Sequence, residues 1–109
     1  MITLCLLVTL FVPIANAECI YPKKNFNIPN GSKATQDELL EAKAKLNYWQ
    51  AVAETYRGCL ENELASIPKE SENFSDLDSM MTDKYNASIE EEKQLADDWN
   101  SAVRAYQSK

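Results

Sequence analysis

The sequence predicts an all-α protein: an antiparallel, coiled-coil-like hairpin of two long helices, with an extended N-terminal segment tethered along the first helix by a disulfide bond. Three observations predict this fold. Apolar residues recur every three or four positions through two stretches of about thirty residues each. A short polar stretch that begins with a proline separates them. Two cysteines remain once an apolar N-terminal run is set aside.

Residues 1–17 have the pattern of a secretory signal peptide. An uncharged apolar run from Ile2 to Ile14 leads into the small residues Ala15 and Ala17, which are the side chains that signal peptidase accepts. No Lys or Arg precedes the run, which departs from the usual signal. We expect cleavage after Ala17 and a secreted or periplasmic mature chain.

Two rival explanations of this N-terminus are weaker. A membrane anchor needs about 20 consecutive apolar residues, and Pro13 and Asn16 end the run too soon. Lipid attachment at Cys19 requires a small preceding residue, and Glu18 is large and charged. We therefore expect no transmembrane segment in the mature chain.

The mature chain keeps two of the three cysteines, Cys19 and Cys59, because Cys5 lies in the signal. Two thiols without any histidine provide only half of a tetrahedral zinc shell, and their spacing is not that of a redox pair. In an oxidising compartment they predict a Cys19–Cys59 disulfide. Closing a loop of about forty residues stabilises a fold by about 4 kcal/mol in the chain-entropy model.

The first helix is predicted over residues 35–67. Thr35 and Glu38 form a capping box, and Pro68 ends the helix because proline disfavours helical geometry in the residue before it. Gly58 offers the competing possibility of an earlier end as a C-cap, but the apolar stripe keeps its phase across it. That stripe consists of Leu39, Ala42, Leu46, Trp49, Ala53, Tyr56, Leu60, Leu64 and Ile67.

Residues 68–74 are predicted as a turn, and the second helix as residues 75–107 with Ser75 as its cap. Glu92 is the one charged residue where the spacing calls for an apolar one. A connection this short returns the second helix antiparallel to the first. The second stripe is Leu77, Met81, Tyr85, Ile89, Ala96, Trp99, Val103 and Tyr106.

The segment 18–34 is predicted to be extended, because it contains two prolines and an Asn-Gly turn. A bond from Cys19 to Cys59 requires the segment to travel about 36 Å back along the first helix. Sixteen extended residues reach about 53 Å, so the geometry closes. We expect the segment to lie in the groove between the helices, with Gly58 making room for it. Its apolar side chains are then a candidate lid: Ile20, Tyr21, Phe26 and Ile28.

The chain is acidic, with 17 acidic and 11 basic residues and a net charge of −6, which argues against a nucleic-acid partner. Acidic residues gather in the second helix and predict three alternatives: a solvated face, a calcium site or a surface for a basic partner. Calcium is disfavoured because neighbouring helical residues point in different directions and no calcium-loop pattern occurs. The candidate surface comprises Glu90, Glu91, Asp97 and Asp98.

The sequence offers few candidate catalytic residues, because it has no histidine and no serine with a recognisable activating neighbour. We expect no enzyme activity, no cofactor and no metal. Most aromatic residues fall on the stripes, but Tyr48 lies beside them and is the candidate for surface binding. Three Asn-x-Ser triplets, at Asn30, Asn73 and Asn86, are glycosylation acceptors only in a eukaryotic host.

Four motifs carry a resemblance to known proteins: IPNGSKAT at 28–35, YRGCLE at 56–61, YNA at 85–87 and DWNSAVRAY at 98–106. Together they resemble small secreted helical proteins of Gram-negative bacteria for which no activity is established. The resemblance implies a periplasmic location and helical character. It implies no role for any residue.

These observations predict a non-catalytic secreted or periplasmic protein that presents a helical face to a protein partner or to the envelope. The alternative is a small carrier that takes up a hydrophobic ligand in the groove beneath the N-terminal segment. A third possibility is self-association, because Leu40, Tyr48 and Val52 broaden the apolar surface of the first helix beyond what one neighbour covers.

Overall fold

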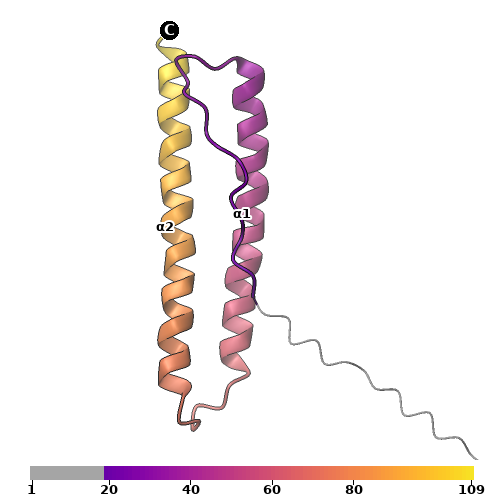
Figure 1. Ribbon diagram of the computed structural model, residues 1–109, viewed down its shortest axis with the longest axis vertical. Coiled ribbons are helices and arrows are strands. Elements are labelled where there is room, and N and C mark those ends of the chain that lie inside the picture. Colours follow the sequence, from indigo (N-terminus) through magenta and orange to yellow (C-terminus); the bar gives the residue numbers. More distant parts are fainter. Residues whose placement is uncertain (1–18) are drawn as a thin grey trace, which may run out of the picture.

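The computed structural model describes residues 19–109 and contains two helices, α1 (Gln36–Ala65) and α2 (Phe74–Gln107). They pack antiparallel as a hairpin, and the described residues contain no strand (Figure 1). The predicted fold class is confirmed. The predicted signal peptide, with Cys5 and the cleavage site after Ala17, lies outside the described residues.

The predicted N-cap is confirmed for α1 but not for α2. At the start of α1, the Thr35 hydroxyl accepts a hydrogen bond from the Glu38 amide at 3.1 Å, as the capping box predicts. The start of α2 differs, because Asn73 occupies the N-cap position without a side-chain bond. Ser75 lies inside the first turn, so its prediction as the cap is wrong. The linker 66–73 is a succession of tight turns that leads directly into Phe74.

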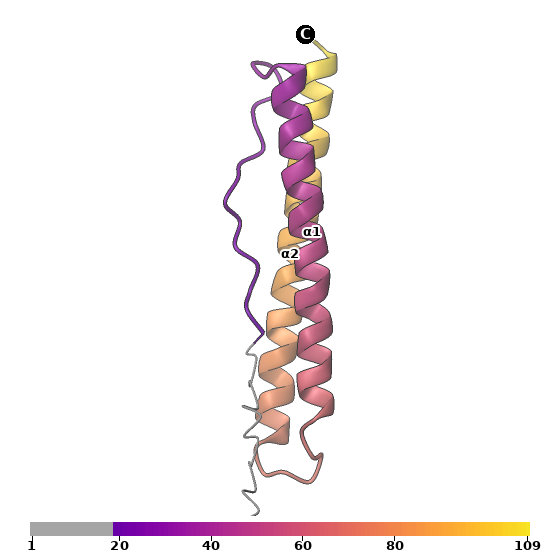
Figure 2. The same ribbon diagram turned by 90° about the vertical axis from the view of Figure 1, so that its right-hand side faces the viewer.

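The N-terminal segment folds back along the hairpin and forms its third element. It runs from the last third of α1 toward the end of the molecule where α2 finishes, on one side of the helix pair (Figures 1 and 2). A disulfide joins Cys19 to Cys59, with the two Cα atoms 5.7 Å apart, which confirms the predicted pairing. Phe26 is buried in a cluster with Leu46, Trp49 and Leu95.

The second end of the segment is held by close packing at the open end of the hairpin. Gly31 is buried, and a Cβ atom built on it would collide with the backbone carbonyl of Ala102 on α2. Nearby, the Lys109 ammonium donates to the carbonyl oxygen of Ala34 at 2.6 Å. The segment is therefore fixed at both ends, by the disulfide and by the Gly31 contact.

This third element changes which residues α2 buries. The buried positions are Met81, Ser88, Leu95 and Ala102, which recur every seven residues, as in coiled coils. The predicted stripe through Ile89, Ala96 and Val103 is only half-buried. Leu46 packs in a cluster with Leu95, and Leu39 in one with Ala102. The buried face of α2 is rotated toward the segment, because the segment covers apolar surface that a two-helix hairpin leaves open.

Glu92, the charged residue on the predicted apolar stripe, is explained by Arg57 of α1. One guanidinium nitrogen of Arg57 lies 3.4 Å from the Glu92 carboxylate, and the other donates to the Ser88 hydroxyl at 3.4 Å. Ser88, which is fully buried, donates in turn to the backbone carbonyl of Tyr85. A polar layer therefore crosses the middle of the hairpin, and each of its side chains has a hydrogen-bond partner.

Helix α1 is continuous through Gly58, so the C-cap alternative is wrong. The expectation that Gly58 makes room for the segment is also wrong, because a Cβ atom there would have no neighbour within 4 Å. The close approach is at Gly31 instead, where the sequence shows only a turn signal.

The two glycines predict opposite effects of substitution by alanine. Gly31→Ala forces a methyl group against the α2 backbone and should destabilise the fold by about 1–3 kcal/mol. Gly58→Ala adds a methyl group in open space and removes backbone freedom, so it should stabilise the fold by about 0.5–1 kcal/mol. Urea unfolding measures both, and each variant is the control for the other. Equal effects would contradict the assigned contacts.

Removing the disulfide should lower the free energy of unfolding by about 4 kcal/mol, since it closes a long loop. The measurement compares the mature protein with its Cys19→Ser/Cys59→Ser variant in urea. Thiol labelling without reductant should leave both cysteines of the mature chain untouched. If the reagent labels Cys19 and Cys59, the two cysteines are not bonded and the segment is not tethered to α1.

Candidate interaction surfaces

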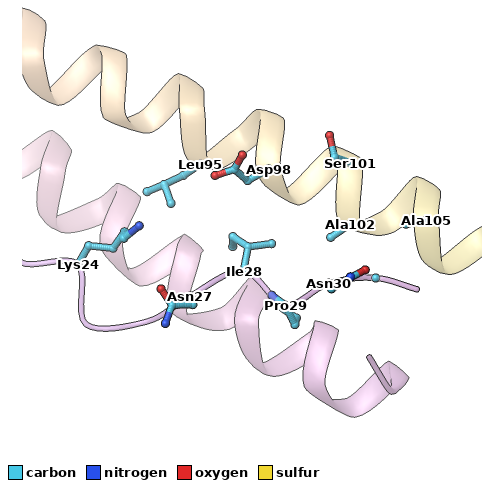
Figure 3. A pocket seen from close by; sticks show the side chains of 11 residues that line it. Lys24, Asn27, Ile28, Pro29, Asn30, Leu95, Asp98, Ser101, Ala102 and Ala105 are labelled. Carbon is cyan, nitrogen blue, oxygen red and sulfur yellow. The ribbon is translucent and has the colours of Figure 1, made fainter. Parts of the chain in front are cut away.

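Two open grooves of more than 500 Å³ flank the N-terminal segment, one against each helix. The α2 groove has a volume of about 520 Å³, and Lys24 and residues 27–31 of the segment form one wall of it. The opposite wall comes from α2: Leu95, Asp98, Ser101, Ala102 and Ala105. In Figure 3 the Ile28 side chain lies between the segment and α2, where it fills the bottom of the groove. The rim is polar, and the Asp98 carboxylate accepts a hydrogen bond from Gln94 at 2.9 Å.

The α1 groove has a volume of about 550 Å³ and a more apolar lining. Segment residues Pro22 and Phe26 form one wall, and Trp49 and Val52 of α1 form the other. Tyr48 stands at the edge of the groove with 74% of its surface exposed. The sequence singled out Tyr48 as the aromatic residue outside the core, and the structure places it there. Lys23 and Lys45 add two cations at the groove.

The predicted lid residues differ in how far they are buried. Phe26 is buried and Ile28 is half-buried, so these two side chains fill the space between the helices. Tyr21 packs edge-on against Tyr56, with the ring centroids 5.2 Å apart. The prediction for Ile20 is wrong, because 77% of its surface is exposed. Successive side chains of an extended chain point to opposite sides, and Cys19 and Tyr21 both face α1.

The acidic residues of α2 do not converge on one site. Glu91 accepts a hydrogen bond from the Tyr21 hydroxyl, and Glu92 pairs with Arg57. Glu90 lies 3.6 Å from Lys93, and Asp97 is exposed. In residues 19–109, no group of three or more carboxylates or cysteines is placed to hold a metal ion. Of the four predicted surface acids, Glu91 is already engaged by the N-terminal segment.

Burial and the neighbouring carboxylate raise the pKa of Tyr21 well above its usual value of 10.0, with burial the larger cause and the hydrogen bond to Glu91 the next. Burial also raises the pKa of Tyr56, the aromatic partner of Tyr21. Both pKa shifts arise where the segment packs against the helices. Neither of the two grooves beside the segment excludes water, because both are open at the surface.

Comparisons of the chain with protein-family models, with curated proteins and with solved structures find no match. The periplasmic location that the resemblance implies therefore stays a prediction. Neither of the two described helices has the length and apolar character needed to cross a membrane. Fold and surface together define a disulfide-bonded helical hairpin with two grooves along its third element.

The raised pKa of Tyr21 predicts how stability depends on alkaline pH. The folded state disfavours tyrosinate, so the contribution of Tyr21 is fully present below the unfolded-state pKa of about 10 and is lost as pH rises through the folded-state pKa. The Tyr21→Phe variant should therefore lose less stability than the parent protein above a pH of about 10. Urea unfolding across this range measures the difference. Tyr48→Phe makes the same change at an exposed tyrosine and is the control for the loss of a hydroxyl group.

Proposed function

We propose that this protein is an exported, non-catalytic interaction protein that binds a protein partner through the α1 groove and Tyr48. The observation that carries the proposal is the exposed Tyr48 ring beside an apolar groove, with 74% of the residue's surface accessible. Tyrosine is enriched at binding surfaces because it combines a large apolar face with a hydroxyl group and has few rotatable bonds.

The rigidity of the groove supports this function. One wall is a continuous helix, and the other is a segment held by the Cys19–Cys59 disulfide and by the Gly31 contact with α2. A surface whose shape is established before binding loses less conformational entropy when the partner arrives. The disulfide therefore has a functional consequence as well as a stabilising one.

Export is supported by two features of the chain. The apolar run that ends in Ala15-Asn16-Ala17 has the form of a cleaved signal. The disulfide between Cys19 and Cys59 persists in oxidising compartments and is rare in reducing ones. Both features point to a location outside the cytoplasm.

The second candidate function is a carrier for a small hydrophobic ligand. Its support is the volume and apolar lining of the α1 groove. The space beneath the segment, where the sequence placed the ligand, is filled by Phe26. A carried ligand would bind in the α1 groove instead.

A photoreactive residue at position 48 in intact cells tests both candidates, with the same residue at position 90 as the control. We expect one dominant protein to be captured through position 48 and not through position 90, since Glu90 is exposed on the distant face of α2. Lipid adducts at position 48 would favour the carrier. Capture through position 90 alone, or no capture at either position, would contradict the role of Tyr48.

A further inference from the structure

A narrow strip along the exposed side of α1 carries no charged residue, although exposed charged residues such as Glu41, Lys45 and Glu54 lie beside it. Positions spaced by three and four residues lie on the side of α1 opposite the core, and we call them the uncharged strip: Leu40, Ala44, Tyr48, Ala51, Thr55, Gly58 and Asn62. Charged residues make up 26% of the chain, yet none occurs at these seven positions. An exposed face of this composition is typical of the centre of a protein interface, where charged residues are depleted.

The side chains of the uncharged strip present apolar surface to the outside. Leu40 is 59% exposed and Tyr48 is 74% exposed. The Thr55 hydroxyl donates to the backbone carbonyl of Ala51 at 3.1 Å, so its methyl group is left facing outward. Space beyond Gly58 is open, since a Cβ atom there would meet nothing within 4 Å.

Six of the seven positions, all but Leu40, are symmetric about Ala53, and this symmetry fits a second copy of the same helix as the partner. An antiparallel second copy of α1, related by a two-fold axis at the level of Ala53, places Tyr48 opposite Gly58 of the second copy. The same axis places Ala51 opposite Thr55 and Ala44 opposite Asn62. Each copy then offers its largest exposed ring to the open space above the other copy's glycine.

Two lysine–glutamate pairs beside the strip fit the same symmetry, whereas Glu54 is brought to within about 3 Å, along the helix, of the level of Glu54 of the second copy. Lys45 and Glu63 are 18 residues apart, which is five helical turns, so they project from the same side of α1. Lys43 and Glu61, on the other side, have the same spacing. The two-fold axis brings Lys45 to within about 3 Å, along the helix, of the level of Glu63 of the second copy. A parallel arrangement would instead place lysine beside lysine.

The long-range charge distribution also favours the antiparallel orientation. Residues 54–92, around the turn, contain 11 acidic and three basic residues. The open end of the hairpin, formed by residues 19–53 and 93–109, contains five acidic and eight basic residues. An antiparallel pair sets the negative half of each copy beside the positive half of the other. Charge complementarity of this kind determines orientation more than affinity.

We propose that the uncharged strip of α1 is an antiparallel homodimer interface centred on Ala53, with Tyr48 of each copy packed over Gly58 of the other. The proposal rests on the proposed function, because both use the exposed Tyr48 face, and it names the partner as a second copy of this chain. The contact is one helix wide, so the dimer should dissociate on dilution.

Equilibrium sedimentation of the mature protein tests the dimer between about 10 μM and 1 mM. We expect a monomer–dimer equilibrium, and Ala51→Glu should raise the dissociation constant by at least about tenfold, because it places a carboxylate near the axis. Ala87→Glu is the matched control, as it makes the same change at an exposed alanine of α2, and it should have no effect. Circular dichroism of both variants checks that the helices are intact.

A charge exchange tests the register and direction. Lys45→Glu should weaken the dimer through the facing Glu63, and the Lys45→Glu/Glu63→Lys variant should restore it. A dimer that forms but is not restored by the exchange would overturn the antiparallel register. A strict monomer at about 1 mM would overturn the dimer itself. If that monomer still captures another protein through position 48, the homodimer fails and the proposed function survives.

Discussion

Two helices that pack against each other leave one side of each apolar stripe exposed to water, and the rest of this structure depends on how that side is covered. The covering element is a stretch of chain without regular structure, so its position relies on attachment rather than on backbone hydrogen bonds. The Cys19–Cys59 disulfide holds one end, and the close contact of Gly31 with Ala102 holds the other. Between these points Phe26 and Ile28 complete the core. Without both attachments, the free energy gained by burying these two side chains would have to offset the conformational entropy lost when the whole segment is ordered.

The position of this segment shapes both the core and the surface. Because it lies on one side of the hairpin, α2 buries Ser88, Leu95 and Ala102 and leaves Ile89 and Val103 at the edge. It also makes the outer walls of two grooves, of which the one against α1 has the more apolar lining. The face of α1 that packs on α2 and on the segment is occupied, so a partner has to bind another face of this helix. The uncharged strip lies on the remaining face of α1, where the fold itself requires no apolar residue. Leu40 and Tyr48 are exposed on this face, and the proposed interface would cover them.

Many features of this fold follow from local rules, since they depend on residues close together in the sequence. The helical spacing, the Thr35 cap and the short polar linker predict two antiparallel helices, and the two mature cysteines predict the disulfide. Apart from the cap of α2, which is Asn73 rather than Ser75, the site residues that the sequence misplaced depend on the third element. Ile20 is exposed because Cys19 and Tyr21 on either side of it face α1. Glu91, predicted as free surface, is engaged by Tyr21, seventy residues away in the chain.

The sequence by itself determined the two helices, their antiparallel order, the disulfide and the exposed position of Tyr48, because periodicity, capping and cysteine count are local or compositional signals. Only the tertiary structure decided which face of α2 is buried, which glycine is required by close packing, and why Glu92 is tolerated beside the core. Each of these depends on the path of the N-terminal segment or on a residue of the opposite helix, as Glu92 depends on Arg57. Such contacts join positions far apart in the chain, and neither the spacing of residues nor the composition specifies which of these positions come into contact.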